Sequence, residues 1–192
     1  DKNNSIIKDF SADIKAGQKV AIVGPTGAGK TTLVNLLMRF YDVDSGSITI
    51  DGIDINNMKR SDVRSLFGMV LQDTWLFSGT LRENIAYSNP DACAVEVYEA
   101  ASLACAEHFI LSSGDGYEMM INEEASNISS GQKQLLTIAR TILANNPMLI
   151  LDEATSNVDT RTEILIQKAM DNLMRNRTSL IIAHRLSTIK NA

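Results

Sequence analysis

Short apolar segments rich in β-branched residues recur along the chain, and each ends in glycine or in polar residues. They cover residues 19–24, 47–52, 67–72, 147–153 and 178–184. The last two are apolar enough to be covered on both faces, as in a parallel sheet. Residues 47–52 alternate between polar and apolar side chains and then turn, which predicts an antiparallel strand.

Helical periodicity separates these predicted strands. Helices are expected over residues 30–40, 90–108, from Ser129 to about 144, and 159–174. Asn89, Pro90 and Asp91 resemble a helix start, and Asp159 or Thr160 is the expected N-cap of the last helix. No strand is predicted between residues 73 and 144. The pattern therefore indicates one α/β domain spanning residues 1–192, with a helical lobe at about 73–144 inserted into its core.

Composition excludes several classes of protein. No apolar run approaches the roughly 18 residues that would span a bilayer. The net charge of −5 argues against a nucleic-acid surface, and two cysteines without metal-ligand partners give no disulfide or zinc framework. The chain starts and stops abruptly, so we expect a domain truncated at both ends.

Residues 24–32, "GPTGAGKTT", match the glycine-rich phosphate-binding motif between a predicted strand and a predicted helix. Backbone N–H groups of such a loop surround phosphate oxygens, and the helix N-terminus adds about half a positive charge. We expect Lys30 to reach the β- and γ-phosphates of a nucleotide and the Thr31 hydroxyl to ligate Mg²⁺. The full set of expected nucleotide-binding residues is Gly24, Pro25, Thr26, Gly27, Ala28, Gly29, Lys30, Thr31 and Thr32.

Polar residues also end the other predicted parallel strands, where ligands bind in open parallel sheets. Asp152 is expected to hold Mg²⁺, and Glu153 to polarise an attacking water. Gln72 is a candidate for holding metal or water, or else an ordinary surface amide. His184 is a candidate donor to the γ-phosphate, although a lone histidine is often only structural.

A second glycine-containing helix start lies at "SSGQ". Ser129 with Gln132 fits a capping box, which requires no function. The same N-terminus, with Ser130 and Gly131, would also attract an anion. Since the first loop already has its own helix, this second site suits a nucleotide held by another molecule.

Together these motifs resemble the nucleotide-binding domain of ABC transporters, most closely the exporter type. The resemblance covers essentially the whole chain and rests on "GPTGAGKT", Gln72, "ISSGQ", "LILDEATSNVD" and His184 in "IIAHRLSTI". It implies a P-loop NTPase fold with a mostly parallel core, an antiparallel β-subdomain and a helical lobe.

The same resemblance implies the partners. ATP with Mg²⁺ would lie between the loop of one subunit and residues 129–132, the signature segment, of a second nucleotide-binding domain. Asp159 would lie along the dimer seam, although it is also a candidate for a simple helix cap. The domain would work at the cytoplasmic face of the membrane and push on transmembrane domains through the region after Gln72.

This chain departs from the family pattern at several positions. Ile128 and Ser130 replace the usual leucine and glycine of the signature, Ala125 replaces a glycine, and Leu135 replaces a frequent arginine. A Cβ at Ser130 crowds the phosphate approach. We therefore expect one half of an asymmetric heterodimer that hydrolyses ATP at its own loop and lends a weaker signature.

The adenine-stacking aromatic residue is expected upstream of Asp1, and the final strands of the domain beyond Ala192. The tyrosines lie elsewhere, at Tyr41, Tyr87, Tyr98 and Tyr117.

Three other functions are compatible with a phosphate-binding loop. A soluble ABC-type ATPase on DNA or ribosomes would need basic arms or coiled-coil insertions, which the sequence lacks. A non-hydrolysing regulatory module does not account for Glu153 and His184. A small-molecule kinase explains neither "SSGQ" nor "LDEATSNVD".

Overall fold

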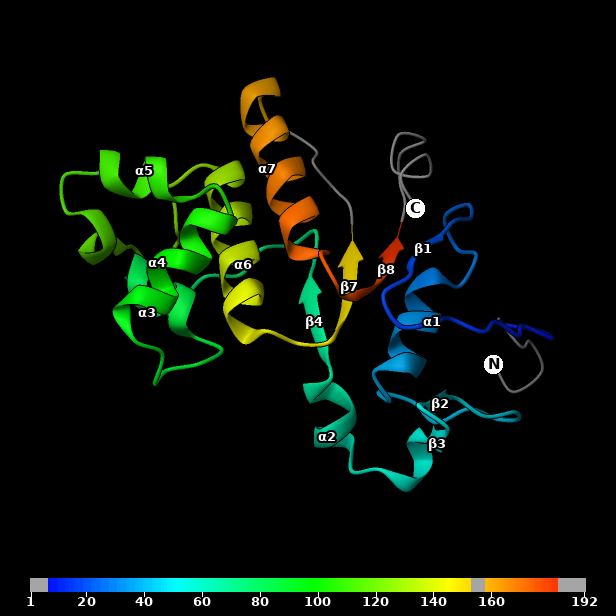
Figure 1. Cartoon of the computed structure of the whole chain (residues 1–192). Helices are drawn as coiled ribbons and strands as arrows, with labels where there is room; N and C mark the ends of the chain where they lie inside the picture. The colour runs from blue at the N-terminus through cyan, green and yellow to red at the C-terminus, as the bar shows by residue number, and fades with distance from the viewer. Residues whose placement is uncertain (1–6, 153–157, 183–192) are drawn as a thin grey trace.

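Four parallel strands form the centre of the computed structural model, which describes residues 7–152 and 158–182. Their order is β1 (Lys19–Ile22), β8 (Thr178–Ile182), β7 (Met148–Asp152) and β4 (Phe67–Val70) (Figure 1). The α/β fold with a parallel core is therefore confirmed. Because neighbours in this sheet are distant in sequence, each connection crosses over, and helices cover both faces.

Successive side chains of each strand point to opposite faces of the sheet and so contribute to two separate apolar clusters. Leu149 and Leu151 of β7 pack with α6 (Ser130–Ala144) and α7 (Thr160–Leu173). Ile150, between them, packs on the other face with α1 (Lys30–Leu37) and α2 (Arg60–Ser65). The strands β7 and β8 are thus buried on both faces, as their continuous apolar segments predict, whereas β1 at the edge is only partly buried.

A small antiparallel hairpin lies beside α1. Its strands are β2 (Thr49–Ile50) and β3 (Ile53–Asp54), followed by the short helix η1 (Ile55–Asn57). The predicted strand over residues 47–52 is therefore antiparallel but shorter. It ends where Asp51 and Gly52 take positive φ angles of 49° and 80°, which suits a tight hairpin turn.

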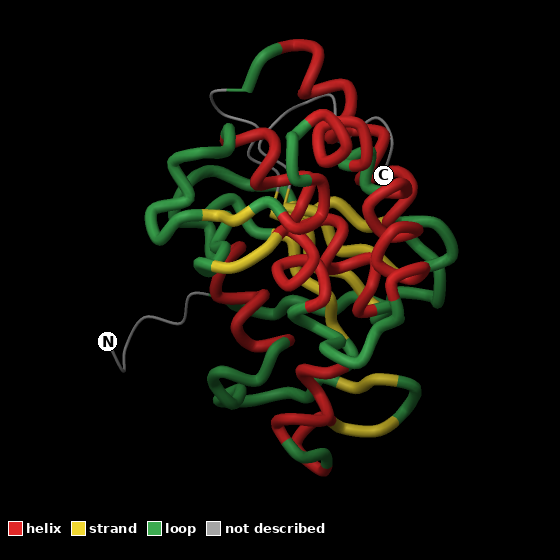
Figure 2. The backbone as a smooth tube through the Cα atoms, turned by 90° about the vertical axis from the view of Figure 1, so that its left-hand side faces the viewer, coloured by secondary structure: helices red, strands yellow, loops and turns green. Residues whose placement is uncertain are grey.

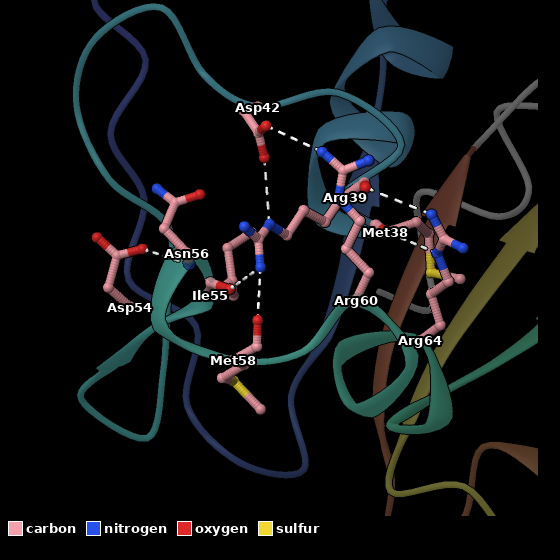
Figure 3. A network of polar contacts seen from close by, with 9 residues as sticks. All are labelled: Met38, Arg39, Asp42, Asp54, Ile55, Asn56, Met58, Arg60 and Arg64. Carbon is pink, nitrogen blue, oxygen red and sulfur yellow. Dashed lines mark hydrogen bonds and ion pairs between the residues drawn. The ribbon is translucent and has the colours of Figure 1, made fainter.

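Arginines hold this hairpin region to the end of α1 (Figure 3). Arg39, just after the helix, has a φ of 50°, so α1 stops before the predicted boundary at residue 40. Its guanidinium donates to the carbonyls of Ile55 at 2.9 Å and Met58 at 2.6 Å. It also pairs with Asp42 at 3.1 Å, and this hydrogen bond lowers the pKa of that carboxyl.

The predicted helical lobe contains four α-helices and a small sheet among the described residues. The helices are α3 (Leu81–Ala86), α4 (Ala94–Leu103), α5 (Glu107–Ser112) and α6, with the short helix η2 (Gly116–Glu118) between the last two. α6 packs against α3, α4 and α7, so it joins the lobe to the sheet. Figure 2 shows these helices in front of the strands.

Two expectations for the lobe are wrong. It contains two-residue strands, β5 (Gly79–Thr80) and β6 (Met120–Ile121), which pair antiparallel and are too short to produce a sequence pattern. The expected helix over residues 90–108 is two helices, because Cys105 takes a φ of 56° and ends α4.

The expected helix start at Asn89 is also wrong. Asn89 accepts a hydrogen bond from the N–H of Ala92 at 3.1 Å, which places Pro90 in a turn. The fixed φ of proline suits the second position of a turn as well as the first position of a helix, so the sequence alone does not separate the two. The true N-cap is Cys93, with Glu96 completing its capping box.

Candidate functional site

The glycine-rich loop connects the end of β1 to the start of α1, as its motif requires. Gly27 and Gly29 take φ angles of 82° and 90°, which favour glycine. The N–H of Ala28 donates to Pro25 O at 3.1 Å and tightens the turn. Residues 24–28 are exposed, so the loop is open to a ligand.

Lys30 is the first residue of α1 and folds back over the loop. Its Nζ donates to Gly24 O at 2.7 Å and to Pro25 O at 3.1 Å. These contacts hold the ammonium beside the exposed loop and the α1 N-terminus, where an anion would bind. Thr31, in the first turn of the same helix, is exposed.

Asp152 lies on the same face of the sheet as α1. It is the last residue of β7, and its register partner on β8 is Ile182, which in turn pairs with Ile22 of β1. Ile182 belongs to the apolar cluster beneath α1, and side chains in one register row share a face. The parallel order thus brings the Asp152 carboxylate to the edge and face occupied by Lys30 and Thr31.

Of the other residues predicted at strand ends, the structure describes only Gln72. Gln72 is exposed, two residues beyond β4, whose Val70 pairs with Leu151 of the central strand. Glu153 and His184 lie outside the described residues. Their assignment therefore rests on their sequence positions, one residue after Asp152 and two residues after Ile182.

The donor set suits a triphosphate with Mg²⁺. Backbone amides, one ammonium, one hydroxyl and one carboxylate match a cation that shares its ligands with phosphate. Within residues 7–152 and 158–182 no group of three or more His, Cys, Asp or Glu side chains could hold a metal ion alone. Mg²⁺ would here be held by Thr31, Asp152 and Gln72 together with the nucleotide.

The second helix start has the capping box that the sequence predicts. Ser129 Oγ accepts from the N–H of Gln132 at 3.2 Å, and the Gln132 side chain accepts from the N–H of Ser129 at 2.8 Å. Ser129 and Ser130 are exposed at the N-terminus of α6. Fifteen residues of α6 follow, so its helix dipole points toward this exposed end.

Gly131 has a packing role that the sequence did not reveal. It is buried, and a Cβ at this position would overlap Thr162 Cγ2 and lie 3.2 Å from Val158 Cγ1. Glycine is therefore needed for the close approach of α6 to the first turn of α7. The only sequence signal for this close packing is the glycine itself, which the sequence assigns to an anion-binding helix start.

Asp159 is the N-cap of α7, as predicted. Its Oδ1 accepts from the N–H of Thr162 at 3.0 Å. Hydrogen bonds from Thr162, first its side chain and then its backbone, lower the pKa of the Asp159 carboxyl. The starts of α6 and α7 therefore meet through Gly131 and Thr162.

Comparison with known proteins identifies the relatives of this arrangement. The model of the family described as "ABC transporter" matches residues 7–156. A fatty acid ABC transporter ATP-binding/permease protein of Mycobacterium tuberculosis is 58% identical over 187 residues, which are 97% of this chain and 30% of that protein. A putative multidrug export ATP-binding/permease protein of Bacillus subtilis is 52% identical over 192 residues, 100% of this chain and 33% of that protein.

A solved structure shows the same fold. A bacterial Atm1-family ABC exporter with ATP bound superposes with a TM-score of 0.89 at 44% identity, covering 100% of this chain and 34% of that one. The chain thus spans about a third of the length of these relatives. Among the helices within the described ranges, none is long and apolar enough to span a membrane.

Proposed function

The chain belongs to the ABC transporter family as one of its ATP-binding domains, and we propose that it is the Mg²⁺-dependent ATPase that drives an exporter. The main support for this proposal is that the carboxyl ends of the parallel strands lie at one edge of a single sheet. The parallel order places the phosphate loop, Gln72 and Asp152 along the same edge. All of these groups suit one nucleotide.

Each group has a role in the proposed site. Loop amides and Lys30 would hold the phosphates, while Thr31 and Asp152 would hold Mg²⁺, with Gln72 as a further ligand or water contact. When bound there, Mg²⁺ would neutralise part of the phosphate charge. Glu153 orients the attacking water, and His184 donates to the γ-phosphate. Positioning and electrostatics carry the rate, without a covalent intermediate.

A second subunit completes the site. Ser129 and Ser130 are exposed at the N-terminus of α6, ahead of the buried Gly131, on a different helix from the one that follows the chain's own loop. In a head-to-tail dimer these groups contact the γ-phosphate bound by the partner, and Asp159 lies at the seam. Ser130 narrows this approach, whereas the residues for hydrolysis at the chain's own loop are all retained. We therefore infer an asymmetric dimer in which this chain supplies the weaker signature.

The membrane part belongs to the whole protein. The relatives named above are ATP-binding/permease proteins about three times longer than this chain. We infer that transmembrane domains contact the region after Gln72 and that the domain works at the cytoplasmic face of the membrane. No nucleic acid takes part.

Replacing Glu153 with Gln in the full-length protein tests hydrolysis. Phosphate release should fall about 10²- to 10⁴-fold because the base for water is lost, while binding of a fluorescent ATP analogue is retained. Glu99→Gln, at an exposed position of α4, is the control and should leave release unchanged. Unchanged release in Glu153→Gln would favour a regulatory module that binds ATP without hydrolysing it.

A further inference from the structure

Three aromatic rings gather in the region after Gln72. Trp75, Phe77 and Tyr87, here called the aromatic cluster, have ring centroids 5.7 to 6.0 Å apart. Trp75 is 59% exposed and Tyr87 55% exposed. So much exposed ring surface requires an explanation, because the rings gain little from burial in the domain itself.

A single arginine holds this cluster in place. The Arg140 guanidinium donates from Nη1 to Trp75 O at 3.1 Å, and from Nε and Nη2 to Asn84 O and Oδ1 at 2.9 and 3.2 Å. Its Cζ lies 4.9 Å from the Tyr87 ring centroid and 6.0 Å from that of Trp75. Burial lowers the pKa of Arg140, so these acceptors replace the water that the guanidinium has lost.

Asn84 extends the network through the loop. Its side chain is fully buried and donates to Phe77 O and Thr80 O, both at 3.0 Å. Its Oδ1 also accepts from the N–H of Phe77 at 3.1 Å. Arg140 and Asn84 therefore fix the loop backbone, the first turn of α3 and the rings as one unit.

Arg140 belongs to α6, whose N-terminus is the signature segment. An α-helix rises about 1.5 Å per residue, so the guanidinium is anchored about 15 Å along the helix from Ser130. Buried packing against α3, α4 and α7 supports α6 over this length. A displacement at one end of α6 therefore moves the groups attached near the other end.

We propose that Arg140 is a positioning residue that fixes the aromatic cluster to α6, so that closure on ATP at the signature segment moves the surface facing the membrane part. The inference rests on the proposed function and adds to it a mechanical connection, through α6 and Arg140, between the signature segment and the aromatic cluster. Lysine cannot replace arginine here, since one ammonium cannot donate in a plane to three acceptors and stack on a ring.

The test is Arg140→Lys in the full-length protein, reconstituted in lipid nanodiscs. Spin-label distances across the membrane part are measured with and without ATP and vanadate, and the affinity for a fluorescent ATP analogue is measured separately. The variant should bind the analogue within about twofold of wild type, while the ATP-dependent shift in distance populations falls at least about threefold.

Arg64→Lys is the matched control. Arg64 also donates to two carbonyls, Met38 O and Arg39 O, and lies over an aromatic ring, Phe40, at 4.7 Å. It belongs to α2, on the other face of the sheet. A purely structural loss lowers the melting temperature in both variants, but only Arg140→Lys should reduce the shift.

The outcomes are distinct. A full shift in Arg140→Lys, with nucleotide bound, overturns the inference. If that variant does not fold, the same distance measurement is made on Tyr87→Leu, which removes an exposed ring on which Arg140 stacks. Tyr98→Leu on α4 is the control for this second variant. A normal shift in Tyr87→Leu then overturns the inference. A wild-type protein that binds no nucleotide overturns the proposed function, and this inference with it.

Discussion

At the scale of residues, Gly131 combines an observed packing role with a proposed role in binding. Gly131 belongs to the segment that suits an anion, yet its missing Cβ is also required by Thr162 and Val158 of the same chain. A change at this position therefore alters helix packing, whether or not Gly131 also lies beside a phosphate as proposed. Loss of activity in a Gly131 variant would not by itself demonstrate contact with a nucleotide.

Gly131→Ala should destabilise the fold by roughly 1–3 kcal/mol, because the new methyl group forces α6 away from α7. Thr162→Ser removes the methyl group that it meets, so the double variant should recover part of the loss. Urea unfolding measures both. Gly114→Ala, where the added Cβ has open space, is the control. Equal stability of the two alanine variants would contradict the packing argument.

At the scale of elements, the start of α7 depends on an ionised cap. Asp159 has a lowered pKa because Thr162 hydrogen-bonds to its carboxylate. A lowered folded-state pKa means that the stabilisation is present above the ordinary carboxyl pKa of about 4 and is lost as the pH falls through the lower value. The cap therefore contributes at neutral pH and not in strong acid.

Asp159→Asn keeps a capping oxygen but cannot titrate. Its melting temperature should lie below that of wild type at neutral pH, and the difference should narrow as the pH falls below about 4. Thermal unfolding followed by circular dichroism at a series of pH values measures this. Asp73→Asn, in an exposed loop, is the control. A difference that stays constant with pH would refute the role of the charge.

At the scale of the whole molecule, the asymmetry of the proposed dimer depends on Ser130. Ser130→Gly in the assembled full-length protein should raise turnover at the partner's loop by about twofold to tenfold, a barrier change below about 1.4 kcal/mol. Single-turnover hydrolysis measures it. Ser61→Gly, also in the first turn of an exposed helix start, is the control. Unchanged turnover at that loop would reject the weaker-signature proposal.

Local chemistry was sufficient for several features. The loop at residues 24–32, the caps of α6 and α7, and the four apolar strands depend on neighbours a few residues away, and all were predictable. The start of α4 was not, because Pro90 fits a turn as well as a helix start. The strands β5 and β6 were missed because two residues carry no periodic signal.

The sequence by itself determined the strand segments, the phosphate loop and the family resemblance, since each follows from short-range backbone preference and residue type. The tertiary structure decided which strands are neighbours, that Asp152 shares a face with α1, and that Gly131 meets Thr162. It also decided that Arg140 reaches Trp75 and Asn84 across 65 and 56 positions of chain. The physical reason is that side-chain packing and strand order depend on contacts between distant segments, which no local pattern encodes.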